Sequence, residues 1–287
     1  MNTEQTNRAQ RKVILVILDG LGFDVARRVL GNIEGWVAAG EARVWKMQSV
    51  LPSTSGPCYA SIHTGVLPQS HGILTNDHQF RVKEPDLFSC LSDAGLRPAA
   101  VAHSYFSTYF QDAPFEPLRD LEVNDESRTI PYARFYTMAG ESKGNPVLPS
   151  DYDLASQVSI LIQRYSPGYV LLHTSSPDSI NHLYGPDSIE TDTNSYQLDG
   201  ALAHSIPGWR EAGFDIMITA DHGHSPRGHH GGTAPDMRDV PLYYFGSAQG
   251  PSGGTQLSQL QIAPTVLSLM GIPIPDSMQA EVFLTES

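Results

Sequence analysis

The segment VILVILDG, residues 13–20, decides the fold of this chain. Six aliphatic residues stand in a row before Asp19 and Gly20, a pattern typical of a strand that a parallel sheet buries on both faces. Comparable apolar runs recur further along, at residues 99–103, 169–173, 215–219 and 240–245. We therefore expect these five runs to form the strands of one central sheet.

Helix-like stretches alternate with the apolar runs. They occupy residues 24–38, 55–64, 151–165, 188–212 and 258–270. Alternating strands and helices predict an α/β fold, with a doubly wound, mostly parallel central sheet flanked by helices. Because ligands of such folds bind at the carboxyl ends of the strands, the residues that follow each strand are the first candidates for a functional site.

The length and composition predict one large globular domain covering residues 1–287. Apolar residues make up 40% of the chain and charged residues 17%, which argues against wholesale disorder. Residues 111–150 are rich in proline and charge and show no clear periodicity. We expect this segment to form an inserted loop or a small lid over the site.

The net charge of −13 limits the partners that the chain can bind. An acidic surface repels a polyanion, so we expect no binding to duplex nucleic acid. The N-terminus is polar, and the apolar run after it is too short for a signal peptide or a membrane span. These features predict a cytoplasmic protein without a membrane partner, and they leave the oligomeric state open.

Metal-binding residue types stand near the ends of three of the apolar runs. They are Asp19, Asp178, His182, Asp221 and His222. Because the carboxyl ends of neighbouring parallel strands share one edge of the sheet, we expect these side chains to converge. Convergence of several carboxylates and imidazoles predicts a metal site.

Two of the candidate ligand positions leave alternatives open. His182 lies four residues after Asp178, a spacing that places both on one face of a helical turn, where they can chelate one ion. A surface pair is the alternative. In RGHHGG, residues 227–232, either His229 or His230 can bind, and we favour His230 because the two glycines after it leave room for a close approach.

Ser55 offers a hydroxyl nucleophile. It is followed by Gly56 and Pro57, and proline is favoured in the first turn of a helix. Ser55 would therefore lie at a helix N-terminus, where free N–H groups favour a phosphoryl group. A metal ion that coordinates the hydroxyl displaces its proton at neutral pH. The alternative is that Ser53, Thr54 and Ser55 form only a capping cluster.

Seven short motifs follow one another along the chain. They read VILDG, PSTSGPCYASIHTG, VLPQSHGILTN, DSINHLYGP, TADHGH, HHGG and QIAPTVLSLMGIPIP. In this order they resemble the alkaline phosphatase superfamily, and most closely its type I phosphodiesterase and nucleotide pyrophosphatase branch. The resemblance runs from the first strand to near the C-terminus.

The resemblance implies two divalent metal ions with separate ligand sets. The first set is Asp19, Ser55, Asp221 and His222. The second set is Asp178, His182 and His230. Because these ligands are carboxylates and imidazoles with no soft sulfur, zinc is the favoured cofactor, with manganese or iron as alternatives.

The resemblance also assigns a role to Asn76. With the backbone N–H after Ser55, its amide would hold a non-bridging phosphoryl oxygen, a role worth about 3 kcal/mol of transition-state stabilisation in comparable sites. The alternative for Asn76 is a turn residue. His71 and His224 lie near the site, and we expect them to support the ligands from outside.

Three residues depart from the patterns of the relatives. The branch usually has threonine in place of Ser55 and often glycine in place of Asn181, where the larger side chain is expected to narrow the pocket. Sulfatases of the same superfamily require an arginine where this chain has Tyr59, which argues against sulfatase activity. Residues 111–150 are too short to supply the inserted domain of the cofactor-independent phosphoglycerate mutase branch.

We therefore hypothesise a two-metal-dependent hydrolase that cleaves a small anionic phosphate ester through a phosphoseryl intermediate on Ser55. Phosphodiesters or nucleotide pyrophosphates are the expected substrates. A phosphomonoesterase or a phosphonate hydrolase would use the same residues and is the first alternative. A non-catalytic metal-binding protein is the second.

Overall fold

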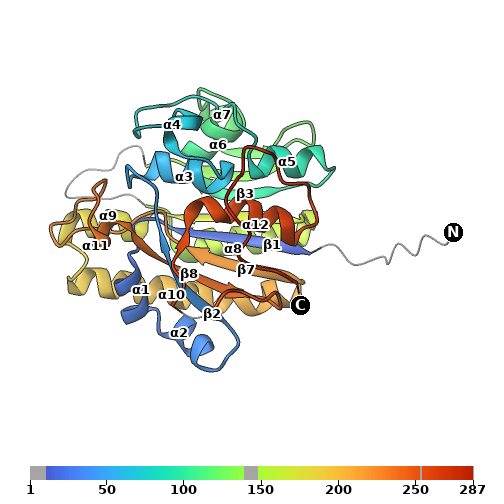
Figure 1. Cartoon of the computed structure of the whole chain (residues 1–287). Coiled ribbons are helices and arrows are strands. Elements are labelled where there is room, and N and C mark those ends of the chain that lie inside the picture. The colour runs from blue at the N-terminus through green and yellow to red at the C-terminus, as the bar shows by residue number, and fades with distance from the viewer. Residues whose placement is uncertain (1–10, 139–147, 253, 287) are drawn as a thin grey trace.

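One nine-stranded sheet runs through the part of the chain that the structure describes, in the order β4–β5–β3–β6–β1–β7–β8–β2–β9 (Figure 1). The computed structural model describes residues 11–138, 148–252 and 254–286. β1 (Lys12–Leu18) lies in the middle, parallel to β6 (Tyr169–Thr174) on one side and to β7 (Phe214–Thr219) on the other. All side chains from Val13 to Leu18 are fully buried, which confirms that helices or loops cover both faces of this strand.

The parallel part of the sheet continues beyond β6. β3 (Ala99–His103) pairs with β6, and β5 (Tyr132–Tyr136) pairs with β3, both in parallel. On the other side, β8 (Asp239–Phe245) runs antiparallel to β7, and β2 (Arg43–Gln48) runs antiparallel to β8. Two short edge strands are β4 (Glu122–Asn124) and β9 (Leu257–Ser258). Five of the eight pairings are parallel, so the expected mostly parallel sheet is confirmed.

Helices cover both faces of the sheet (Figure 1). The layer on one face is built around α10 and comprises α1 (Phe23–Val29), α2 (Gly31–Ala38), α8 (Asp151–Tyr165), α9 (Ser176–Tyr184) and α10 (Ile189–Glu211). The layer on the other face is built around α3 and comprises α3 (Ser55–Thr64), α5 (Leu87–Asp93), α6 (Ser104–Phe110) and α12 (Ile262–Leu269). The short helical turns are α4 (Pro68–His71), α7 (Pro117–Asp120), α11 (Pro235–Arg238) and η1 (Gln259–Gln261).

Two helices begin and end where the sequence predicts them, α3 at residues 55–64 and α8 at residues 151–165. The helix expected over residues 24–38 is interrupted instead. Leu30, with φ −80° and ψ 66°, leaves the helical region and separates α1 from α2. A change of chain direction at a single residue is invisible to periodicity, because both pieces keep their apolar side on the sheet.

The described part of residues 111–150 corrects the expectation of an irregular loop. It contains α7, β4 and β5, and β5 is an integral strand of the sheet. The buried carboxylate of Asp120 anchors it through ion pairs with Arg119 (2.6 Å) and Arg128 (3.0 Å). This stretch therefore builds one edge of the sheet, while residues 139–147 of the expected lid lie outside the described residues.

Two further observations concern membrane-spanning helices and the cysteines. Among the described residues, no helix combines the length and the apolar character that crossing a bilayer requires. Cys58 is buried, Cys90 is partly buried, and both are free thiols.

Candidate metal centre

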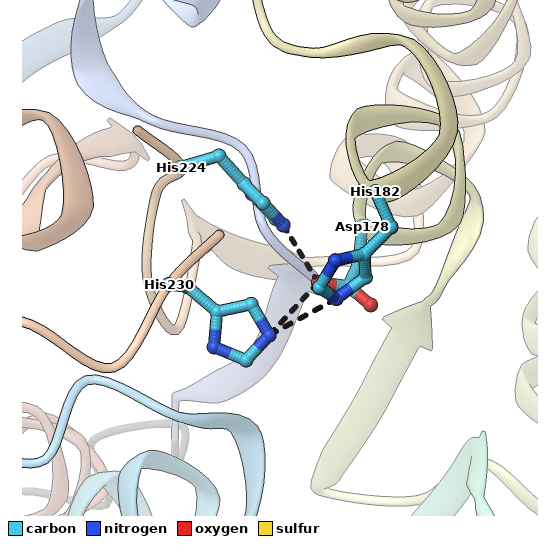
Figure 2. Close-up of side chains that lie close together, drawn as sticks. All are labelled: Asp178, His182, His224 and His230. Atoms are coloured by element: carbon cyan, nitrogen blue, oxygen red, sulfur yellow. Dashed lines mark hydrogen bonds and ion pairs between the residues drawn. The ribbon is translucent and has the colours of Figure 1, made fainter. Parts of the chain in front are cut away.

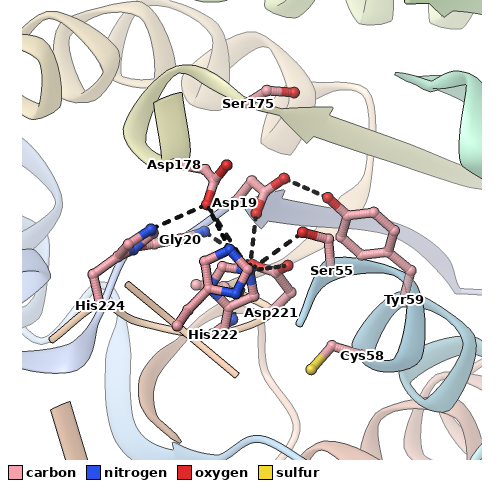
Figure 3. Close-up of polar contacts among 12 residues, drawn as sticks. Asp19, Gly20, Ser55, Cys58, Tyr59, Ser175, Asp178, Asp221, His222 and His224 are labelled. Atoms are coloured by element: carbon pink, nitrogen blue, oxygen red, sulfur yellow. Dashed lines mark hydrogen bonds and ion pairs between the residues drawn. The ribbon is translucent and has the colours of Figure 1, made fainter. Parts of the chain in front are cut away.

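Three adjacent strands deliver the candidate ligands to one point of the sheet. β6, β1 and β7 are neighbours, so the segments that follow them start side by side. Asp19 follows β1, and Asp221 with His222 follows β7. The helix α9, which carries Asp178 and His182, begins two residues after β6. The structure thus brings together residues that are up to two hundred positions apart in the sequence (Figure 3).

Four side chains form an outer group and meet at one oxygen of Asp178 (Figure 2). They are Asp178, His182, His224 and His230. Asp178 Oδ1 lies 3.2 Å from His224 Nε2, 3.5 Å from His182 Nε2 and 3.7 Å from His230 Nε2. His182 Nε2 and His230 Nε2 are 3.1 Å apart. Of the two candidates in RGHHGG, the structure brings His230 into this group and leaves His229 exposed.

An inner group lies deeper and contains Asp19, Asp221, His222 and Ser55 (Figure 3). His222 Nε2 is 3.2 Å from Asp221 Oδ2, 3.5 Å from Asp19 Oδ1 and 3.3 Å from Ser55 Oγ. Asp178 Oδ1 is 4.0 Å from the same nitrogen, so Asp178 connects the inner group with the outer one.

The donor atoms fit bound cations. Asp19 Oδ1, Asp178 Oδ1 and Asp221 Oδ2 are buried and have no hydrogen-bond partner within the described residues. Buried polar atoms are normally paired, and leaving a carboxylate oxygen unpaired is costly. Three carboxylates at one point also repel one another unless a positive charge lies between them. Divalent ions held by these oxygens and by the neighbouring imidazoles would satisfy both requirements.

The protonation states of two buried histidines suit metal binding, whereas the neighbouring carboxyls of Asp19 and Asp221 are shifted in opposite directions. Burial lowers the pKa of His222 and of His230 to about 3, so both imidazoles are neutral at pH 7, as metal ligands must be. Burial, and then the charge of Asp19, raises the pKa of Asp221 well above its usual value. The pKa of Asp19 is instead held well below its usual range, because a hydrogen bond and the charge of His173 outweigh the effect of burial.

Ser55 is the first residue of α3 and is 7% exposed. Thr54 precedes it in extended conformation, and the Thr54 side chain makes no capping hydrogen bond to α3. The alternative that these residues form only a capping cluster therefore has no support at Thr54. The hydroxyl lies within the inner group instead. The positive end of the α3 dipole therefore lies beside the ligand cluster, where it favours negative charge.

Asn76 lies next to the start of α3. The backbone N–H of Gly56 donates to Asn76 Oδ1 at 2.8 Å. The resemblance implies that this N–H holds a phosphoryl oxygen, but in the structure it already donates to Asn76. A Cβ on Gly56 would lie 2.7 Å from the Tyr109 hydroxyl, which explains why glycine follows the serine.

A buried chain of hydrogen bonds behind Asp19 was not foreseen from the sequence. The Tyr59 hydroxyl donates to Asp19 Oδ2, and His173 Nε2 lies 2.7 Å from the Tyr59 oxygen. The Tyr136 hydroxyl lies 2.8 Å from His173 Nδ1. The one available signal was a histidine in the otherwise apolar run at residues 169–173. Tyr59, which replaces the sulfatase arginine, thus orients a carboxylate of the inner group.

Asn181 does not project into the site as expected. Its amide nitrogen donates to the Gly20 carbonyl at 3.0 Å, and its oxygen accepts from the Thr191 hydroxyl at 2.8 Å. Both ends of the side chain are therefore used inside the fold. His71 is also held elsewhere, with Nε2 3.0 Å from the Ser61 hydroxyl.

The chain is similar to known proteins over most of its length. Residues 13–233 match the family described as type I phosphodiesterase / nucleotide pyrophosphatase. By sequence, the chain is 28% identical over 186 residues to a 2,3-bisphosphoglycerate-independent phosphoglycerate mutase of Ruegeria pomeroyi, covering 56% of this chain and 35% of the mutase. The chain spans about a third of the length of the curated relatives it matches.

Solved structures share the fold. Murine ectonucleotide pyrophosphatase / phosphodiesterase 5, as an inactive variant in complex with AMP, superposes with a TM-score of 0.69 at 13% identity, over 93% of this chain and 96% of that one. Phosphonoacetate hydrolase from Sinorhizobium meliloti, in complex with phosphonoformate, superposes with a TM-score of 0.53 at 22% identity, over 75% of this chain and 56% of that one.

Proposed function

Because the chain belongs to the type I phosphodiesterase / nucleotide pyrophosphatase family, we propose that it hydrolyses phosphate esters at the metal centre, with Ser55 as the nucleophile. The observation that carries the proposal is the position of the Ser55 hydroxyl. It lies at a helix N-terminus, 3.3 Å from His222 Nε2 and within the inner group of ligands. A hydroxyl in this position has the surroundings that phosphoryl transfer requires.

The proposed centre holds two divalent ions, for which zinc is the favoured candidate. Asp19, Ser55, Asp221 and His222 would hold one, and Asp178, His182 and His230 the other. When bound, such a pair lowers the pKa of the nucleophile and stabilises the charge that develops on the leaving oxygen.

The chain's own groups supply the covalent chemistry. The Ser55 hydroxyl gives up its proton to solvent, and Oγ forms a bond to phosphorus as the bond from phosphorus to the leaving oxygen breaks in line. The leaving group departs as an oxyanion that water can protonate, and the product is a phosphoseryl enzyme. Water then forms a new bond to phosphorus, and the bond to Ser55 Oγ breaks. The Asn76 amide N–H groups would hold a non-bridging oxygen, with the amide oxygen fixed by the backbone N–H of Gly56.

The proposed substrate is a small anionic phosphodiester or a nucleotide pyrophosphate. The family match supports this class, and the AMP-bound relative with the same fold is consistent with it. A phosphonate or phosphomonoester substrate is the alternative, which the fold shared with phosphonoacetate hydrolase keeps open.

The test is Ser55→Ala with metal-loaded protein. We expect turnover of bis-p-nitrophenyl phosphate to fall on the order of 10⁴-fold or more, because the nucleophile is lost. The six other proposed ligands should still retain metal, as elemental analysis would show. Unchanged turnover would refute the proposal. Faster turnover of p-nitrophenyl phosphate or of phosphonoacetate by the wild type would select the alternative substrate class.

A further inference from the structure

His224 carries a nitrogen that the proposed ligand sets leave unused. Its side chain is fully buried, and Nε2 has no hydrogen-bond partner among the described residues. A buried nitrogen without a partner costs about 1–3 kcal/mol, so such an atom calls for an explanation. The nitrogen points into the outer group, 3.2 Å from Asp178 Oδ1 (Figure 2).

The opposite nitrogen of the ring fixes this orientation. His224 Nδ1 lies 3.1 Å from the Gly20 carbonyl oxygen, which accepts its proton. The lone pair is then on Nε2, directed at the outer group. His182 shows the same arrangement, with Nδ1 2.8 Å from the Gly228 carbonyl and Nε2 directed inward. A backbone carbonyl on one ring nitrogen is the usual support of a metal-binding histidine.

The separations of the four donor atoms also suit one ion. All four lie within 4.8 Å of one another, and the shortest separations are 3.1 and 3.2 Å. Donors at about 2.1 Å from a tetrahedral ion stand roughly 3.4 Å apart. The His224 ring is 4.9 Å from that of His182 and 5.1 Å from that of His230, edge to face in both cases.

The space for His224 is built into the surrounding residues. A Cβ on Gly20 would lie 2.6 Å from His224 Cε1, so glycine at this position makes room for the ring. Asn181 donates to the same Gly20 carbonyl that holds His224 Nδ1. Gly20 therefore makes room for the His224 ring, and its carbonyl is shared by His224 and Asn181.

We propose that His224 is a fourth protein ligand of the outer ion, beside Asp178, His182 and His230. This inference rests on the two-metal centre of the proposed function. Four protein donors fill a tetrahedral shell, whereas a catalytic ion needs an open position. To bind substrate as well, the outer ion would therefore need five or six ligands in total. Manganese and iron accept this coordination number readily, and zinc accepts it when its coordination shell expands.

The first experiment compares His224→Ala with His229→Ala, an exposed histidine of the neighbouring loop, by competition of zinc with a chromogenic chelator. We expect His224→Ala to lower the affinity for one of the two ions at least about tenfold. His229→Ala should leave both affinities unchanged. Equal affinities in the wild type and both variants would overturn the inference.

A measurement on the wild type removes any dependence on how the variant folds. In ¹¹³Cd-loaded protein with ¹⁵N-labelled histidine, we expect one cadmium ion to show one-bond coupling to three histidine nitrogens, those of His182, His224 and His230. Coupling to only two would overturn the inference. Absence of phosphoesterase activity would refute the proposed function and leave this ligand assignment untouched, so the two failures are distinguishable.

Discussion

The inner and outer groups of the metal centre differ in how firmly the fold holds them. Asp221 and His222 are completely buried at the end of β7, and two backbone N–H groups, of Gly20 and His222, donate to Asp221 Oδ1 at 2.9 Å. In the outer group, the His182 side chain is 43% exposed and stands on the short helix α9. The nucleophile thus lies beside the fully buried half of the centre, and His182 is the most exposed side chain of the outer half.

The largest effect should come from removing charge in the inner group. Asp221→Asn keeps an oxygen that can accept from the two backbone N–H groups but loses the carboxylate charge. We expect turnover to fall on the order of 10³-fold or more, with no rescue by added metal, because the inner ion is lost. The stability of the metal-free protein should hold or rise, since a buried repulsion with Asp19 disappears.

The exposed Asp187, replaced by Asn, is the matched control for that experiment and should change neither quantity. Steady-state kinetics and thermal unfolding without metal give both readouts. If excess metal restored Asp221→Asn to wild-type turnover, the proposed difference between the buried inner group and the more exposed outer group would be refuted.

A smaller effect is expected in the outer group. His182→Ala removes a half-exposed ligand, and water can take its place. We expect the affinity for one ion to fall about 10–100-fold and turnover to recover as the metal concentration is raised. Turnover measured across a series of buffered metal concentrations checks this. A loss of turnover that persists at saturating metal would show that substitutions in the outer group are tolerated no better than those in the inner group.

The hydrogen-bond chain behind Asp19 should contribute less again. Tyr59→Phe removes the hydroxyl that donates to Asp19 and keeps the ring that stacks on Phe106 at 4.6 Å. We expect about a tenfold loss of metal affinity, because Asp19 is less well oriented. Tyr169→Phe is the control, since that buried hydroxyl lies 3.5 Å from His63 and away from the ligands. Equal affinities in the two variants would refute this role for Tyr59.

A separate effect, measured on another scale, concerns the stability of the metal-free protein. The pKa of His222 is lowered to about 3 in the folded chain, so its contribution to stability is complete above the unfolded value near 6.5 and is lost as the pH falls towards 3. Urea unfolding of metal-free protein should therefore show a decrease between pH 7 and pH 5 that His222→Asn reduces by up to about 2 kcal/mol. An identical decrease of stability in both proteins would contradict the lowered pKa of His222.

The sequence predicts the centre of the molecule better than its edges. The run that forms β1 and the serine that begins α3 leave little ambiguity, because an uninterrupted aliphatic strand and a Ser-Gly-Pro helix start each have one common structural meaning. β2 was missed because RVWKMQ alternates polar and apolar residues and contains no aliphatic run. β5 was missed for a similar reason, since YARFY is aromatic and interrupted by arginine.

The limits within the site have a different origin. Asp19, Asp178 and Asp221 were identified because each follows a recognisable strand. The partners of these ligands depend on tertiary contacts that no spacing encodes, as with the Tyr59 hydroxyl on Asp19. His224 lies two residues after His222 on irregular backbone, where the sequence gives no direction for the side chain.

Anomalous diffraction from crystals of the metal-loaded protein tests the central claim most directly. The account predicts two separate peaks, one within bonding distance of Ser55 Oγ, Asp19, Asp221 and His222, and one within bonding distance of Asp178, His182 and His230. A single peak, or ions bound away from Ser55, would contradict it.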